Sequence, residues 1–133
     1  MEKSKIIKKF KYCGFECLIC VINGTHYTAY VGIPKNHPFY GKDYEYVDDF
    51  VDVHGGVTFS GDEVLGYKKE GVWWFGIDFA HAGDICVGRY IVSPLPPLPL
   101  LGEQRVWNLK KVEKEIKDFA KQLVIDNLVA KEI

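Results

Sequence analysis

Four side chains that can transfer protons or bind a metal ion stand near small residues in two short segments of the sequence. His54 precedes two glycines, and Asp78, His81 and Asp84 follow one another at the end of an aromatic run. Imidazole and carboxylate groups act as general acids and bases, and both also bind divalent metal ions. The sequence therefore predicts that these four residues line one pocket, as acid–base groups or as metal ligands. No HExxH or similar ligand spacing is present, so proton transfer is the first interpretation and a divalent metal the second.

The segment His54–Ser60 adds groups that can hold an anion or a carbonyl oxygen. Its adjacent glycines let backbone amides approach a ligand closely, and the hydroxyls of Thr58 and Ser60 follow. No GxSxG turn surrounds Ser60, so a serine nucleophile is not predicted. Rings that can stack on a base, and cations that can hold phosphate, stand elsewhere in the chain. The predicted ligand-binding residues are His54, Gly55, Gly56, Thr58, Ser60, Trp74, Asp78, His81, Asp84, Lys42, Tyr40 and Arg105.

The cysteines predict a reducing compartment rather than a cofactor site. Cys17 and Cys20 have the spacing of half a zinc site, but no second pair completes four ligands. On a strand these two side chains point to opposite faces. We therefore expect all four cysteines to be small core residues.

Strand patterns fill the first two-thirds of the chain. Asn23-Gly24 predicts a tight hairpin between Phe15–Ile22 and Thr25–Ile33. Apolar, aromatic and β-branched residues predict further strands at Phe10–Cys13, Phe50–Val53, Val57–Ser60, Val64–Tyr67, Val72–Phe79 and Cys86–Val92. A long loop is expected over Pro34–Asp49 and a tight turn over Lys68–Gly71. In Val72–Phe79, alternation sends Trp73, Phe75, Ile77 and Phe79 to one face, and Trp74 and Asp78 to the other.

The last quarter of the chain predicts a helix over residues 108–131, capped by Asn108 and preceded by a proline–leucine connector over residues 93–102. We expect an α+β fold, in which an antiparallel, strongly bent sheet or small barrel of about six strands spans residues 10–92. The C-terminal helix packs on one face of that sheet. The helix has more apolar residues than one stripe requires, and this surplus predicts a homo-oligomer.

Composition and charge exclude several classes of protein. The chain has 133 residues, of which 47% are hydrophobic and 26% charged, with a formal net charge of −1. These values are typical of a globular domain and not of a disordered tail or a disulfide-rich toxin. No signal peptide or membrane-spanning run is evident. We expect a single cytoplasmic domain over residues 1–133, with no membrane contact and no attraction to DNA or RNA duplexes.

Charge is nonetheless uneven along the chain. The segment Met1–Lys11 carries five lysines against one glutamate, whereas Asp43–Asp52 carries five acidic residues and no base. Such an acidic segment forms either a solvated surface or a cation site, and both interpretations stay open.

Three segments together resemble a family of small phage and prophage proteins. They are GIPKNHPFYGK at Gly32–Lys42, HGGVTFS at His54–Ser60 and WWFGIDFAHAGD at Trp73–Asp84, and they occur in the order seen in that family. The family resemblance leads us to expect a cysteine or another small residue where Phe79 stands, and a phenyl ring there would narrow the pocket. By its phage context, the resemblance implies a counter-defence protein that acts on nucleotide immune signals.

Three functions follow from these observations. The first is capture and sequestration of a small nucleotide-derived signal, such as a cyclic ADP-ribose isomer or a cyclic oligonucleotide. The second is a metal-dependent hydrolase or phosphodiesterase that uses His54, Asp78, His81 and Asp84. The third is a phage protein–protein interaction module that binds no small ligand.

Overall fold

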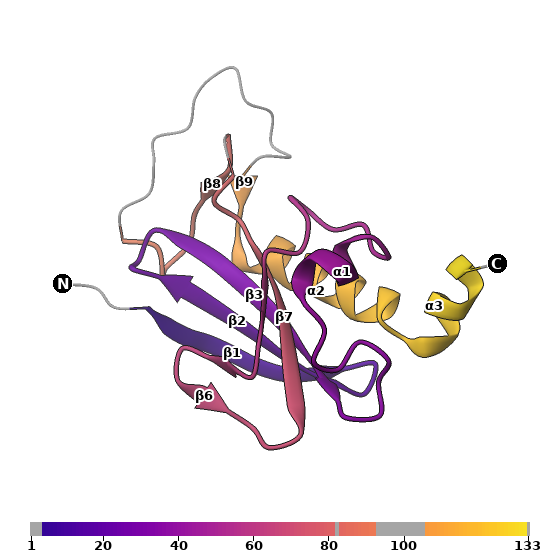
Figure 1. The fold of residues 1–133 in the computed structure, drawn as a ribbon. Coiled ribbons are helices and arrows are strands. Elements are labelled where there is room, and N and C mark those ends of the chain that lie inside the picture. Colours follow the sequence, from indigo (N-terminus) through magenta and orange to yellow (C-terminus); the bar gives the residue numbers. More distant parts are fainter. Residues whose placement is uncertain (1–3, 82, 93–105, 133) are drawn as a thin grey trace.

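The computed structural model describes residues 4–81, 83–92 and 106–132. Its main sheet is antiparallel and has the strand order β1–β2–β3–β7–β4 (Figure 1). These strands are β1 Lys5–Tyr12, β2 Phe15–Ile22, β3 His26–Pro34, β7 Val72–Asp78 and β4 Phe59–Gly61. The other elements are α1 Tyr44–Asp48, β5 Glu63–Val64, β6 Tyr67–Lys68, β8 Ile85–Cys86, β9 Val106–Trp107, α2 Leu109–Gln122 and α3 Ile125–Glu132. The α+β class is confirmed, and the sheet is open rather than closed into a barrel.

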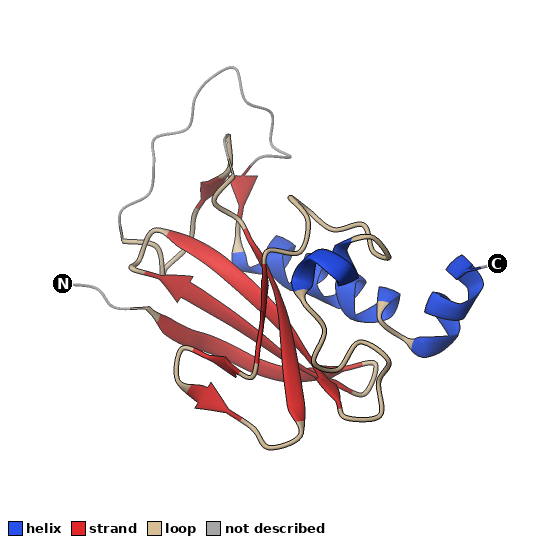
Figure 2. Ribbon diagram, viewed as in Figure 1, coloured by secondary structure: helices blue, strands red, loops and turns tan. Residues whose placement is uncertain are grey.

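The main sheet carries a hydrophobic layer on each face. Helix α2 packs against β2 and β3 through an apolar side that includes Val112, Ile116 and Phe119, which are fully buried (Figure 2). Alternation along β7 is confirmed, because Phe75 contributes to this layer while Trp74 contributes to the layer on the opposite face. Each face of the sheet therefore contributes to a hydrophobic cluster.

The predicted hairpin is confirmed, with Asn23-Gly24 between β2 and β3. The strand predicted over Phe50–Val53 is wrong, because its backbone bonds to side chains of α2 instead of a neighbouring strand. Gln122 accepts from the amide of Asp52 at 2.7 Å and donates to the carbonyl of the same residue at 2.7 Å. A segment tied to a helix in this way is held as a loop.

At three other positions the observed strands differ from the predicted ones: two are shorter, and one predicted strand is a hairpin of two strands. Only Phe59 and Ser60 of the range Val57–Ser60 lie in β4, and only Cys86 of the range Cys86–Val92 lies in β8. The range Val64–Tyr67 is a hairpin, β5–β6, rather than one strand. Short strands like these have too few residues for alternation to mark their ends.

The predicted helix over residues 108–131 is two helices, and its predicted N-cap is confirmed. The side chain of Asn108 accepts a hydrogen bond from the amide of Lys111 at 2.9 Å. α2 ends at the C-cap Leu123, whose carbonyl accepts a hydrogen bond from Nε2 of His37 at 2.7 Å. In a longer helix, a backbone amide of the following turn would donate to this carbonyl. The imidazole thus takes the place of a backbone donor at the end of α2.

The long loop predicted over Pro34–Asp49 contains the short helix α1. The side chain of Asp43 caps this helix by accepting from the amide of Tyr44 at 3.0 Å. Asp48 accepts from the amide of Val57 at 2.8 Å. Two residues of the acidic segment therefore organise the backbone of this region.

Three of the four cysteines are buried, whereas Cys13 is exposed in the turn between β1 and β2. The core prediction is therefore wrong for Cys13, because the tight turn leaves it outside both hydrophobic layers. Cys17 and Cys20 belong to layers on opposite faces of the sheet, as predicted. Burial raises the pKa of each of these two thiols to about 12. Within the described ranges, no helix has the length and apolar character needed to cross a membrane.

Candidate active site

The carboxylate of Asp84 is the centre of the predicted polar cluster. It is almost fully buried, with 2% of its side chain exposed. Oδ2 lies 2.8 Å from Nε2 of His54 and accepts from the backbone amide of His81 at 3.1 Å. Oδ1 accepts from Nε1 of Trp107 at 3.1 Å. Three donors thus satisfy a carboxylate that has little access to water.

His54 is held by three separate parts of the chain. Its backbone amide donates to Oε2 of Glu115 on α2 at 2.9 Å. Its ring is nearly parallel to Phe79, with centroids 5.7 Å apart, and lies 4.5 Å from the ring of Trp107. When Nε2 donates to an ionised Asp84, Nδ1 keeps the lone pair of the imidazole. The arrangement therefore orients His54 as a base or as a metal ligand.

Phe79, at which the sequence predicted a narrowed pocket, forms part of the surroundings of His54. It is fully buried and packs against Trp107 as well, with centroids 4.6 Å apart. The phenyl ring fixes the plane of the imidazole from one side. A rigid orientation of this kind favours a site that acts through one nitrogen in a defined direction.

His81 approaches the same cluster from the end of β7. Its ring meets that of His54 edge to face, with centroids 5.4 Å apart. Nε2 of His81 is buried and has no hydrogen-bond partner among the described residues. Oδ1 of Asp78 lies 3.2 Å from this nitrogen, but outside the directions of a hydrogen bond. The nitrogen thus has a carboxylate within ion-pair distance but lacks the hydrogen bond that buried polar groups normally have.

Gly55 makes room for His81. Its φ angle is +70°, and a Cβ atom at this position would overlap the imidazole of His81 at Nε2. Glycine meets both requirements, because it adopts positive φ without strain and has no side chain. The Gly-Gly pair predicted to cradle a ligand therefore has a packing role at its first position.

Three members of the cluster offer ligand atoms close together. One atom each from His54, His81 and Asp84 lies within 4.8 Å of the others. Two imidazoles and one carboxylate form a donor set that suits zinc and other divalent transition metals. The hydrogen bond between His54 and Asp84 and the candidate metal centre involve the same residues, so the two interpretations of the sequence concern one site.

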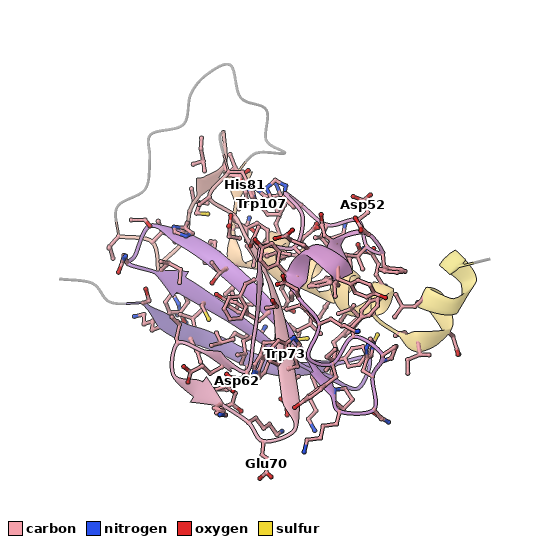
Figure 3. All side chains as sticks on the ribbon, in the orientation of Figure 1. Asp52, Asp62, Glu70, Trp73, His81 and Trp107 are labelled. Carbon is pink, nitrogen blue, oxygen red and sulfur yellow. The ribbon has the colours of Figure 1, made fainter. Side chains whose placement is uncertain are left out.

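The structure does not bring every predicted residue to this cluster. The carbonyl of Lys42 accepts from Nε1 of Trp73 at 2.9 Å, and the ring of Tyr40 lies 6.2 Å from that of Trp73. Trp73 is near the start of β7, whereas His81 follows its end (Figure 3). Tyr40 and Lys42 are therefore separated from His81 by the length of this strand.

Trp74 and Ser60 also lie apart from the cluster. Trp74 is fully buried in the layer on the opposite face of the sheet. Ser60 accepts from the amide of Tyr44 at 3.0 Å and donates to Asp43 at 3.2 Å, so it supports the start of α1.

The remaining predicted residues lie near β7 or outside the described ranges. Thr58 is exposed, and its amide donates to the carbonyl of Gly76 in β7 at 2.9 Å. The amide of Gly56 donates to Val53 at 3.0 Å. Arg105 lies outside the described residues.

Trp107 and Glu115 are residues of the cluster that were absent from the predicted site. The rings of Trp107 and His81 both contact the ring of His54, and Figure 3 labels the two residues in the same region of the molecule. The parallel pair β8–β9 brings Trp107 to Asp84, since Cys86 pairs with Trp107. The sequence signal for this contact is weak, because β8 and β9 each contain only two residues.

Comparisons with known proteins add no family or fold assignment. No family model matches the chain, and neither a curated protein nor a solved structure matches it. The resemblance to phage proteins therefore stays a prediction from the three motifs.

Proposed function

We propose that the protein is a metal-dependent hydrolase with a centre formed by His54, His81 and Asp84. The observation that carries this proposal is the buried Nε2 of His81, which has no hydrogen-bond partner among the described residues. An unsatisfied buried polar group costs about 1–3 kcal/mol. His54, His81 and Asp84 each offer a ligand atom within 4.8 Å of the others, and a metal ion bound through Nε2 of His81 would offset that cost.

The donor set favours hydrolysis among the chemistries that metals support. Catalytic zinc centres use three protein ligands and leave a position open for water, whose pKa the ion lowers. In this chain Asp84 keeps its hydrogen bonds to Trp107 and to the backbone of His81, which fix the carboxylate. Asp78 is the adjacent carboxylate outside the donor set, and it is placed to accept a proton from water.

The proposed substrate class rests on the resemblance to phage proteins described in the sequence analysis. The phage resemblance implies nucleotide signals, and phosphodiester hydrolysis is the reaction that a centre of this type would perform on them. Sequestration without turnover stays a prediction as well. It is less well supported by the geometry, because Tyr40, Lys42 and Trp74 do not lie beside His54.

The test begins with metal binding. Protein stripped with EDTA is titrated with Zn²⁺ and Mn²⁺ by calorimetry, and His81→Ala is compared with His26→Ala. His26 is a matched control because it stands at the start of β3 and bonds through Nδ1 to the hydroxyl of Thr25 at 2.9 Å. We expect one site that is lost in His81→Ala and kept in His26→Ala.

The second step measures turnover. Metal-loaded protein is incubated with cyclic oligonucleotides and cyclic ADP-ribose isomers, and the solution is separated by chromatography before and after heat denaturation. New products that disappear with EDTA and in His81→Ala support the proposal. Turnover that persists in EDTA would exclude a metal and leave His54 and Asp84 as an acid–base pair. A compound that vanishes on mixing and returns intact on heating would replace hydrolysis by sequestration.

A further inference from the structure

We propose that the surface formed by β1 and α2 binds single-stranded nucleic acid. We call this surface the basic face. Helix α2 holds five lysines and three acidic residues, and Lys8 of β1 lies against it, although the whole chain has 17 basic and 18 acidic residues. The lysines of the basic face are Lys8, Lys110, Lys111, Lys114, Lys117 and Lys121, whereas Lys9 lies over the ring of Tyr67 on the opposite face of the sheet. The inference goes beyond hydrolysis at His54 and rests on different residues.

Among the three acidic residues of α2, Glu113 is paired with lysines and the other two accept hydrogen bonds from neutral groups. Glu113 bonds to both Lys8 and Lys117, and these bonds lower the pKa of its carboxyl. Glu115 accepts from the amide of His54, and Asp118 accepts from Gln122. Among the described residues, neither Lys110 nor Lys114 forms an ion pair with an acid. With six lysines against three carboxylates, the basic face keeps an excess of positive charge.

A groove along α2 concentrates this charge beside an aromatic ring. It has a volume of about 500 Å³ and is lined by Tyr12, Lys110, Lys111, Glu113, Lys114, Lys117, Asp118 and Lys121. Nζ of Lys117 lies 5.3 Å from the ring centroid of Tyr12, and Nζ of Lys121 lies 6.0 Å from it. Nζ of Lys8 lies 5.6 Å from the ring centroid of Phe10. Ammonium groups and rings thus alternate across the boundary between β1 and α2.

This alternation favours a single strand over a duplex or an anionic membrane. Ammonium groups hold phosphates, and a half-buried ring offers a face on which an unpaired base can stack. A duplex keeps its bases stacked inside and cannot use the rings. An anionic membrane attracts the same lysines but offers no planar group that stacks on the rings. α2 has 14 residues and is about 21 Å long, enough to accompany several nucleotides.

The basic face adjoins the candidate active site at Lys111. Nζ of Lys111 donates to the carbonyl of Val106 at 2.7 Å and lies 5.0 Å from the ring centroid of Trp107. Trp107 in turn contacts His54 and Asp84. A strand bound along α2 would therefore pass close to the proposed metal centre, so a bound strand would also be a candidate substrate.

The test measures fluorescence polarisation of a labelled oligothymidylate with the full chain in EDTA. EDTA separates this test from the proposed hydrolysis, because binding by the basic face requires no metal. If three phosphates are contacted, raising the salt from about 50 to 200 mM lowers the affinity about 20-fold. We expect the double variant Lys114→Glu, Lys121→Glu to lose at least tenfold in affinity. The matched double variant Lys35→Glu, Lys68→Glu changes exposed lysines outside β1 and α2, and it should stay within about twofold of the native affinity.

Several results would overturn the inference. One is the absence of binding at the lower salt concentration, and another is an equal loss in both double variants. Equal affinity for a duplex, or preferential binding to vesicles of anionic lipid, would assign the basic face to a different partner. Tyr12→Ala tests the role of the ring, and unchanged affinity in this variant would exclude base stacking. Thermal unfolding of each variant verifies that the fold is retained.

Discussion

Replacing Gly55 with alanine tests the packing of the candidate site most directly. Alanine at φ +70° adopts a left-handed conformation that costs about 1–2 kcal/mol. Its Cβ also overlaps His81 at Nε2, so the imidazole must leave its position. We therefore expect two separable effects, a loss of stability from the backbone and a loss of metal affinity from the displaced ligand.

Gly66→Ala is the matched control for the first effect. Gly66 has φ +82° in the turn between β5 and β6, and a Cβ there would meet no atom within 4 Å. The two variants should therefore share the strain of about 1–2 kcal/mol. Only Gly55→Ala should weaken the metal site. Loss of a group that merely supports a ligand costs 10–100-fold in affinity, so displacement of a ligand should cost about 100-fold, or about 3 kcal/mol.

The assay combines urea unfolding of the metal-free proteins with calorimetric titration of Zn²⁺. The expected result is a similar loss of stability in both variants and a weakened Zn²⁺ affinity in Gly55→Ala alone. The reasoning would be refuted if Gly55→Ala and Gly66→Ala bound Zn²⁺ with affinities within threefold of each other.

Three further predictions concern stability and thiol reactivity. Trp107→Phe removes the donor to Oδ1 of Asp84 while keeping an aromatic ring, and it should cost about 1.5–3 kcal/mol in urea unfolding. Burial lowers the pKa of His37, whose Nδ1 accepts from the amide of Phe39 at 3.0 Å. The unfolded chain therefore binds the proton more readily, so stability should fall as the pH is lowered from 7 through about 6.5 to the pKa of the folded state. In the native protein, a thiol reagent should modify Cys13 quickly and leave three buried thiols unreacted: Cys17, Cys20 and Cys86.

Each of these predictions has an outcome that contradicts it. An unfolding free energy unchanged in Trp107→Phe would show that the indole donor contributes nothing to the site. For His37, the comparison is His37→Gln, which should flatten the decrease in stability at acidic pH, and an identical pH profile would exclude its role. Rapid modification of more than one thiol before unfolding would contradict the burial of the other three.

Local patterns in the sequence determined much of the fold. The Asn23-Gly24 turn, the alternation of Phe75 and Trp74 along β7, and the cap at Asn108 depend on residues within a few positions of one another. For the same reason the sequence placed His81 and Asp84 together, because the turn after β7 keeps them adjacent. Periodicity and capping are local properties, and the sequence carries them directly.

The tertiary structure alone decided which distant segments complete the site. It joins His54 to Asp84 and brings Trp107 to both, while it leaves Tyr40 and Lys42 near the start of β7. It also gathers positive charge on α2 and the adjoining Lys8 of β1, within a chain whose net charge is −1. Contacts between distant residues depend on how loops and helices pack across the sheet. The net charge of the chain contains no information about where on the surface the charges lie.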